Sequence, residues 1–302
     1  MNRKKFLKKS LLGAAGVVTG YSVLEAKNNG GFKSTYDKLM AQVGFNHLPN
    51  AGNDLDKQNL KGDKTMNTVL HKANTRGHAN HGWLDSHHSF SFANYYNPER
   101  MNFGVLRVLN DDVVAAGRGF GTHPHDNMEI ISIPLAGDLE HKDSMGTSAV
   151  IKEGDIQVMS AGTGIYHSEY NKNSDKEVRF LQIWVFPNKQ NVTPRYDQIT
   201  LKEVEAQNKF YQVLSPNQND QGVWVHQDAW FNLGKFEKGT EDTYKLNKKS
   251  NGVYAFVLDG EVTIGDQKLN KRDGFGVWNT DEIKLTADSD ARVLLMEVPM
   301  TI

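Results

Sequence analysis

The feature that most constrains the fold is a succession of short β-type runs separated by turns rich in Gly, Asn and Asp. The clearest runs in the first half cover residues 103–109, 129–135 and 179–186. A similar pattern restarts near Phe210, with its clearest runs at residues 252–258, 261–264 and 292–298. Many short strands of this kind are typical of β-sandwiches and β-barrels. The sequence therefore predicts an all-β chain with two barrels in tandem.

The length of 302 residues fits two domains of ordinary size. We expect a first barrel domain over residues 66–195 and a second over residues 196–302. Residues 27–65 are rich in Asn, Gly, Lys and Asp and contain few apolar side chains, which predicts a linker or loosely packed extension.

The amino terminus has the pattern of an export signal. A basic segment, MNRKKFLKKS, precedes the apolar stretch LLGAAGVVTGYSVL, and Ala26 offers a small residue at a plausible cleavage point. The apolar stretch is too short to span a bilayer comfortably, so we expect no stable membrane span. Residues 3–8 resemble a twin-arginine signal, except that Lys4 stands where the second arginine belongs. We therefore expect residues 1–26 to direct export to the periplasm or cell envelope; the alternative is a surface helix of a cytoplasmic protein.

Composition excludes several kinds of chemistry. The 35 Lys and Arg residues balance 36 Asp and Glu residues, for a formal net charge of -1, so nucleic acid is not an expected partner. The chain has no Cys, which rules out disulfides, thiolate metal sites and a cysteine nucleophile. Histidines and carboxylates are therefore the main candidate metal ligands.

Two short segments place such ligands at the same spacing. His123 and His125 stand two residues apart, and His167 and Glu169 repeat that spacing about forty residues later. Residues i and i+2 of an extended strand project to the same side, so each pair can point into a barrel. A His-x-His pair alone is a weak signal, but the two pairs together predict a site of three nitrogens and one oxygen. Such a site suits Fe(II), Mn, Ni, Cu or Zn.

These segments resemble the paired motifs of the cupin superfamily and, in detail, the pirin family. Two further segments, 76–86 (RGHANHGWLDS) and 139–146 (LEHKDSMG), are similar to other signatures of that family. The resemblance covers roughly residues 68–188, while the carboxyl-terminal part resembles, more loosely, the second cupin of the bacterial quercetinase-like branch. It implies two cupin (jelly-roll) barrels, the first of which binds metal.

The resemblance also implies the site residues. The pirin ligands fall on His123, His125, His167 and Glu169, around one divalent ion, with Fe(II) as the first expectation and Mn, Ni, Cu or Zn as alternatives. Glu129 stays open as a rival fourth ligand, because general cupins often use a glutamate there and the spacing from His125 is even. Otherwise we expect Glu129 to orient a histidine. His141, in a turn that resembles one near the pocket mouth, is a candidate for a similar supporting role or for substrate contact.

The remaining histidines receive no ligand role. His87 and His88 are adjacent and so face opposite sides of a strand, and His78 and His81 belong to a motif that we assign to folding or the pocket wall. His226 is the last histidine of the chain, so the second barrel is predicted to be metal-free. We assign the tryptophans mainly to the core and none of them to chemistry.

By resemblance, the first hypothesis is a quercetin 2,3-dioxygenase-like enzyme that opens a flavonol-like substrate with O2. Glu169 would then accept the proton of the substrate hydroxyl. The second hypothesis is a metal-binding regulatory or redox-sensing pirin without turnover. A third is isomerase or other small-molecule chemistry on the same scaffold, because fold and ligands do not determine the substrate.

Overall fold

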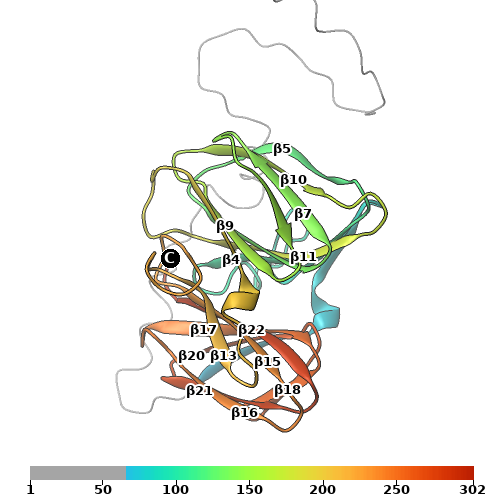
Figure 1. The fold of residues 1–302 in the computed structure, drawn as a ribbon. Helices are drawn as coiled ribbons and strands as arrows, with labels where there is room; N and C mark the ends of the chain where they lie inside the picture. Colours follow the sequence, from blue (N-terminus) through green and yellow to red (C-terminus); the bar gives the residue numbers. More distant parts are fainter. Residues whose placement is uncertain (1–65) are drawn as a thin grey trace, which may run out of the picture.

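The computed structural model describes residues 66–302, which form short β-strands and two single-turn 3-10 helices. Among these residues, no helix is long and apolar enough to cross a membrane. The expected export signal and linker, residues 1–26 and 27–65, lie outside the described residues. The strands assemble into two stacked barrels, each made of a seven-stranded and a four-stranded sheet (Figure 1). The prediction of an all-β chain with two cupin barrels is confirmed.

The first barrel has a seven-stranded sheet of order β12-β9-β6-β11-β4-β3-β2 and a four-stranded sheet of order β5-β10-β7-β8. Its strands are β2 (Gly77–Asn80), β3 (Leu84–His88), β4 (Leu106–Val114), β5 (Gly119–His125), β6 (Glu129–Ala136), β7 (Asp138–Asp143), β8 (Ser148–Lys152), β9 (Asp155–Ser160), β10 (Ile165–Asn171), β11 (Val178–Val185) and β12 (Arg195–Thr200). The helix η1 (Ala73–Thr75) precedes β2, and η2 (Leu201–Glu203) follows β12.

The second barrel repeats this arrangement with sheets of order β1-β20-β17-β22-β15-β13-β14 and β16-β21-β18-β19. Its strands are β1 (Asn67–His71), β13 (Phe210–Ser215), β14 (Val223–Trp224), β15 (Trp230–Phe236), β16 (Glu241–Lys245), β17 (Asn251–Asp259), β18 (Glu261–Ile264), β19 (Gln267–Asn270), β20 (Gly274–Trp278), β21 (Glu282–Ala287) and β22 (Ala291–Pro299).

The chain crosses between the barrels at its amino-terminal strand. We expected residues 66–195 to form the first domain, but β1 pairs antiparallel with β20 of the second barrel. Strand β12, at the other expected boundary, completes the first barrel by pairing with β9. The strands of the first barrel, β2 to β12, therefore lie in the chain between β1 and β13, which both belong to the second barrel, so the two domains are linked by two crossings of the chain.

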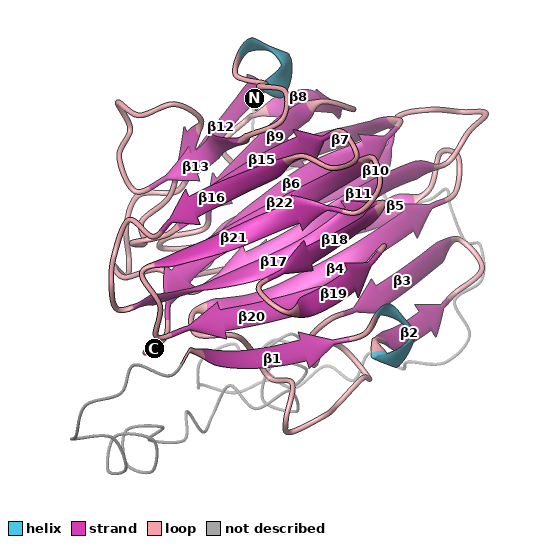
Figure 2. Cartoon of the chain, turned by 90° about the horizontal axis from the view of Figure 1, so that it is seen from below, coloured by secondary structure: helices cyan, strands magenta, loops and turns pink. Residues whose placement is uncertain are grey.

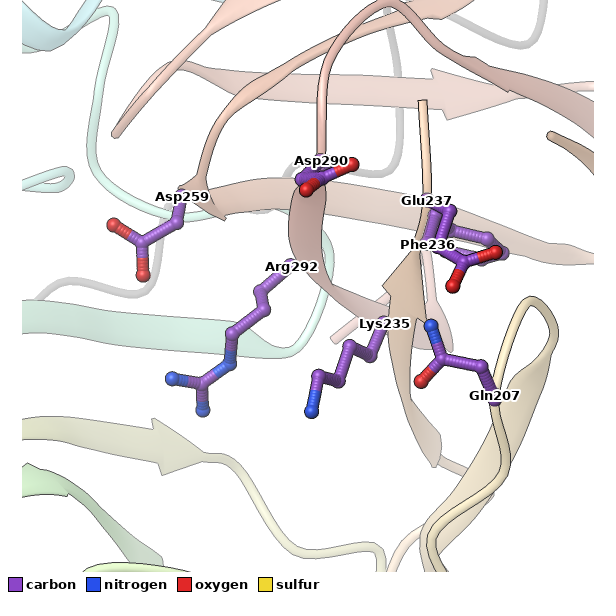
Figure 3. A pocket seen from close by; sticks show the side chains of 8 residues that line it. Gln207, Lys235, Phe236, Glu237, Asp259, Asp290 and Arg292 are labelled. Carbon is purple, nitrogen blue, oxygen red and sulfur yellow. The ribbon is translucent and has the colours of Figure 1, made fainter. Parts of the chain in front are cut away.

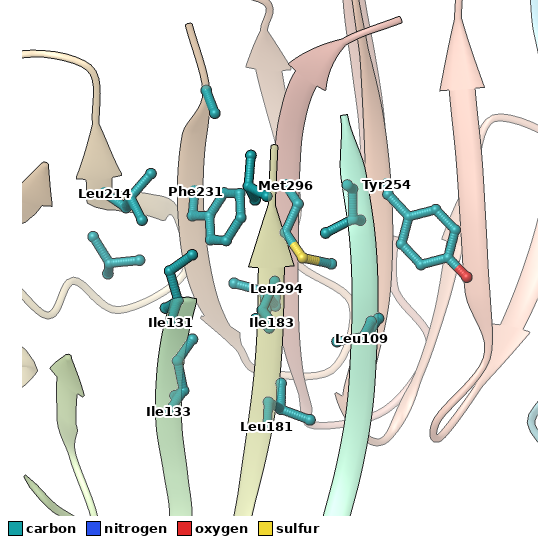
Figure 4. Packing of buried hydrophobic residues seen from close by; sticks show 14 of the residues in the cluster. Leu109, Ile131, Ile133, Leu181, Ile183, Leu214, Phe231, Tyr254, Leu294 and Met296 are labelled. Atoms are coloured by element: carbon teal, nitrogen blue, oxygen red, sulfur yellow. The ribbon is translucent and has the colours of Figure 1, made fainter. Parts of the chain in front are cut away.

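The largest hydrophobic cluster lies between the two seven-stranded sheets. It joins side chains of both barrels, including Leu109, Ile131, Ile133, Leu181 and Ile183 from the first and Leu214, Phe231, Tyr254, Leu294 and Met296 from the second (Figure 4). Because strand residues alternate between faces, Leu181 and Ile183 of β11 point into this interface. The alternate residues Gln182 and Trp184 point into the first barrel. There Gln182 donates a hydrogen bond to Glu169, and Trp184 packs in an apolar cluster of that barrel.

This alternation makes a prediction for β11. Ile183 is fully buried in the interface, so Ile183→Ala should lower the free energy of unfolding by about 2 to 5 kcal/mol through lost burial and a residual cavity. Metal content should not change, because Ile183 points away from the barrel interior. Chemical denaturation and metal analysis measure the two effects.

Arg179→Ala on the same face of β11 is the matched control. The Arg179 side chain is exposed and pairs with Glu177 at the end of the strand, so its loss should change stability by no more than about 0.5 kcal/mol. Loss of metal in Ile183→Ala would contradict the separation of the two faces.

Candidate metal centre

Strands β5 and β10 bring the two predicted ligand pairs together. The strands are antiparallel neighbours in the four-stranded sheet (Figure 1). His123 lies directly opposite His167, and His125 lies opposite Ile165. The ladder shifts register between His167 and Glu169, where an irregularity interrupts β10. The buried residues of β10 are Ile165, His167, Glu169 and Asn171, so both predicted ligands of this strand point inward.

The three histidines form a triangle of imidazole rings. Ring centroids are 4.4 Å apart for His123 and His167 and 4.9 Å apart for His125 with either of the others. Burial lowers the pKa of all three, that of His125 to about 3. His123 Nδ1 donates a hydrogen bond to the Gly121 carbonyl at 2.7 Å, which leaves its Nε2 with a lone pair. At neutral pH the rings are therefore uncharged and able to act as ligands.

The histidines fit a divalent metal ion. Both ring nitrogens of His167 are buried and have no hydrogen-bond partner in the described part of the chain. Buried polar atoms are normally paired, so an orphaned imidazole needs a ligand. His123, His125 and His167 each offer a nitrogen within 4.8 Å of the others. Which atoms bind the ion stays a prediction, but the donors suit Fe(II), Mn, Ni, Cu or Zn.

Glu169 lies beside this triangle and is turned toward the opposite sheet. Its carboxylate accepts hydrogen bonds from Ser132 Oγ at 3.1 Å and from Gln182 Nε2 at 2.6 Å. It shares a second potential ligand group with His141 and His167, rather than with His123 and His125. Burial raises the pKa of Glu169 to about 7, against the lowering effect of the two hydrogen bonds. The carboxyl group can therefore gain or lose a proton near neutral pH.

His141 on β7 is held against the site by an acidic partner. Its Nε2 lies 3.0 Å from Asp143 Oδ2, and both side chains are fully buried. Asp143 also accepts the backbone N–H groups of Met145 and Thr147, which hold it in place. The His141 ring centroid is 5.4 Å from that of His167, and its buried Nδ1 has no hydrogen-bond partner among residues 66–302. His141 thus belongs to the neighbourhood of the predicted site.

Glu129 lies on the other side of the sheet. Between β5 and β6, Asn127 adopts a positive φ of 44°, so the two-residue alternation from His125 does not continue to Glu129. Glu129 shares the face of Ile131, which packs between the barrels, and accepts a hydrogen bond from Ser160 Oγ at 2.7 Å. The expected contact between Glu129 and a histidine of the centre is replaced by this bond. The even spacing between His125 and Glu129 did not predict a shared face, because alternation of side chains holds within a strand and not across the turn at Asn127.

An apolar wall lies next to His125. It consists of buried residues from several strands and the adjoining loops, namely Val108, Met128, Ile130, Met159, Ala161, Ile165 and Trp184. The Trp184 ring meets His125 edge to face at 4.9 Å. Its Nε1 is buried without a hydrogen-bond partner in the described chain. Trp184, which we had assigned to the core, thus brings an unused donor to the predicted site.

The partners of the predicted residues were not among the candidates from the sequence. Ser132 and Gln182 hold Glu169, and Asp143 holds His141. Ser132 and Gln182 interrupt the otherwise apolar runs IISIPL and FLQIWV. A polar residue inside a buried strand is costly unless it is hydrogen-bonded, so these interruptions were a usable signal.

A separate hollow of about 490 Å³ lies on the second barrel (Figure 3). Its lining carries charges of both signs, from Lys235 and Arg292 on one hand and Glu237, Asp259 and Asp290 on the other. It contains no histidine and comes from strands other than those of the histidine triangle. We assign it no chemistry.

Fold and site together define a bicupin protein whose first barrel has a donor set for a divalent metal. The pirin family model matches residues 69–185, and the model of the quercetinase C-terminal cupin domain matches residues 212–298. The chain belongs to the pirin family.

Named relatives share much of the chain. A quercetin 2,3-dioxygenase of Escherichia coli is 46% identical over 230 residues, which are 76% of this chain and 98% of that protein. A putative quercetin 2,3-dioxygenase of Pseudomonas aeruginosa is 40% identical and matches 74% of this chain and 95% of its own length. The crystal structure of the bacterial pirin YhhW from Escherichia coli in complex with nickel(II) superposes with a TM-score of 0.73 at 46% identity, covering 77% of this chain and 99% of that chain. These relatives place the chain in a family of cupin dioxygenases.

The roles of the two buried glutamates of the first barrel, Glu129 and Glu169, can be distinguished by metal binding. If Glu169 is the fourth ligand, Glu169→Gln should weaken metal binding by more than the roughly 10- to 100-fold loss that removal of an outer partner causes. Glu129→Gln should leave the affinity unchanged, because Glu129 is on the face of β6 that points away from the histidine triangle, where it is bonded to Ser160. Competition titration with a metal-binding dye measures both. Equal losses, or a larger loss in Glu129→Gln, would reverse the assignment.

The same Glu129→Gln variant should alter the pH dependence of stability. Burial raises the pKa of Glu129 from 4.5 to about 7. Between these values the folded state holds a proton that the unfolded state has lost, so Glu129 makes stability fall as pH rises through this window. The variant lacks this penalty. Its free energy of unfolding relative to wild type should therefore increase by roughly 1 to 3 kcal/mol between pH 5 and pH 8. Urea denaturation across this range measures the difference in free energy of unfolding between variant and wild type. A difference that does not change with pH would contradict the raised pKa of Glu129.

Proposed function

We propose that the protein is a metal-dependent dioxygenase that opens a flavonol-like, enolisable substrate with O2. The observation that carries the proposal is the convergence of three uncharged imidazoles and a proton-accepting carboxyl group beside an apolar, aromatic wall. Relatives called quercetin 2,3-dioxygenase support this substrate class. We further propose Fe(II) as the native metal, because chemistry with O2 calls for a redox-active ion. The nickel(II) bound by the related pirin supports a divalent ion at this centre.

His123, His125 and His167 would hold the ion, with Glu169 as the proposed fourth ligand. A divalent ion bound there would act as a Lewis acid on the substrate oxygens and lower the pKa of the substrate hydroxyl. His123 is partly exposed whereas His125 and His167 are buried, so a small molecule can approach from the side of His123. The protein residues then determine how the substrate is oriented and where its proton goes.

The apolar wall would orient the substrate. Trp184 and its neighbours offer a flat, water-poor surface against which an aromatic ring system can stack. The unpartnered Trp184 Nε1–H can donate a hydrogen bond to a carbonyl oxygen of the substrate. A planar molecule with a hydroxyl group next to a carbonyl group would satisfy both features.

Glu169 would take the hydroxyl proton. It would do so on loosening from the ion, because a carboxylate bound to a divalent cation is a weak base. Away from an ion, burial raises its pKa to about 7, which suits a general base near neutral pH. Ser132 and Gln182 are neutral donors that keep the carboxyl group in place, and neither competes for the proton. His141, which is held by Asp143, lies close to Glu169 and His167 and would restrict the movement of both side chains.

The proposal is tested by oxygen uptake together with the loss of flavonol absorbance, using protein loaded separately with Fe(II), Mn(II), Ni(II), Cu(II) or Zn(II). We expect turnover with at least one redox-active metal, and a rate lower by roughly 100-fold or more in His123→Ala, because a ligand is lost. His81→Ala is the matched control. The sequence motif had assigned His81 to folding or the pocket wall, but its side chain is exposed and belongs to no potential ligand group among residues 66–302, so the variant should keep the wild-type rate. Absence of turnover with every metal, or full activity in His123→Ala, would overturn the proposal.

A further inference from the structure

A second group of potential ligands lies on the hairpin of β2 and β3, at the edge of the seven-stranded sheet (Figure 2). His78 pairs directly with His87, and Asp85 occupies the neighbouring register position opposite Asn80. Asp85 and His87 are two residues apart on β3, so they share a face. The inward face of β3 is taken by the buried residues Leu84, Ser86 and His88. His78, Asp85 and His87 therefore meet on the outward face of this hairpin.

The three side chains already lie within ligand distance. His78 Nε2 is 2.7 Å from Asp85 Oδ1, and His87 Nδ1 is 3.8 Å from the same oxygen. The imidazole rings are stacked, with centroids 4.4 Å apart and planes inclined by 19°. The relative solvent accessibility of the side chain is 51% for His78, 42% for Asp85 and 36% for His87, so a hydrated ion can reach all three.

We propose that His78, Asp85 and His87 bind a second divalent transition-metal ion of the Zn²⁺ type. Two imidazole nitrogens and one carboxylate oxygen are ordinary ligands of zinc, and water can fill a fourth, tetrahedral position. Ligand atoms around such an ion lie about 3.3 Å apart. The two nitrogen–oxygen separations bracket this value, and the three ligand atoms all lie within 4.8 Å of one another. Small side-chain rotations would therefore suffice to bring them around one ion. From the sequence these histidines received no ligand role, His78 being assigned to folding or the pocket wall, and Asp85 was not among the candidate ligands.

The location gives the ion a structural consequence. Strand β2 ends the sheet and has a single neighbour, β3. Beside the hairpin, Asp111 binds Arg76 at 3.2 Å and Arg272 of the second barrel at 2.9 Å. An ion on His78 and His87 would cross-link the edge strand to β3 next to this contact between the barrels. It would stabilise the fold without taking part in the chemistry of the first centre.

The test counts zinc bound to the metal-free, full-length chain by equilibrium dialysis and elemental analysis. The double variant His123→Ala/His167→Ala removes ligands from both potential groups of the first centre, since His167 belongs to each, so the zinc that remains reports the second site. Adding His87→Ala to that background should remove one further Zn²⁺ per chain and abolish the rise in melting temperature caused by Zn²⁺. Adding His81→Ala, which changes an exposed histidine of the same hairpin outside the ligand group, should change neither.

A conservative variant guards against misfolding. Asp85→Asn keeps the shape of the side chain but loses its charge, and should weaken zinc binding in the same background by roughly tenfold or more. Unchanged zinc stoichiometry and affinity in both His87→Ala and Asp85→Asn would overturn the proposal. These readouts do not involve turnover, so they stand whether or not the first centre is a dioxygenase.

Discussion

The structure depends on the packing of two seven-stranded sheets against each other. Each sheet places one set of alternating residues in the shared interface, and this fixes the direction of every remaining side chain. In β11, Leu181 and Ile183 are committed to the interface, so Gln182 and Trp184 must point into the first barrel. A slip of one residue would bury Gln182 between the barrels and remove a donor from Glu169. The hydrophobic interface thereby determines how the residues of the predicted metal centre are oriented, although none of its side chains belongs to that centre.

The inward face carries a row of polar residues at one level of the sheet. His88, Asn110, Gln182, Ser132 and Gln157 are consecutive partners across β3, β4, β11, β6 and β9, and all are buried. Two members of this row, Ser132 and Gln182, reach across the barrel to Glu169 on β10. Donors that stand on paired strands have little freedom to move, so the carboxyl group is supported by the scaffold rather than by a loop. Since both donors are uncharged, burial prevails and the pKa of Glu169 rises to about 7.

The sequence was sufficient for the strands and for the two inward-facing ligand pairs, because both depend on alternation within a strand. The runs at 129–135, 179–186 and 261–264 closely match β6, β11 and β18, and His123 and His125 share a face as their spacing predicts. What could not be predicted depends on pairing between strands. The crossing of β1 into the second barrel, the bond of Ser132 to Glu169 and the meeting of His78 with His87 follow from register, which single-strand patterns do not encode. The direction of Glu129 could not be predicted for a different reason. Asn127, which has a positive φ, interrupts the alternation of side-chain direction between His125 and Glu129.

The two barrels share one architecture, and the side chains that fill their interiors explain why only the first has a predicted metal centre. In the second barrel the interior is filled with apolar side chains, among them Phe236, Val257 and Leu285. Its buried carboxylate, Glu297, accepts hydrogen bonds from Tyr244 Oη, from the Asn247 and Lys248 backbones and from two asparagine side chains. A carboxylate surrounded by this many donors has few lone pairs left to bind an ion. Glu169 receives two neutral donors and lies beside an imidazole with no partner in the described chain. The two carboxyl groups therefore differ in how completely their neighbours satisfy them with hydrogen bonds, and Glu169 is the less completely satisfied of the two.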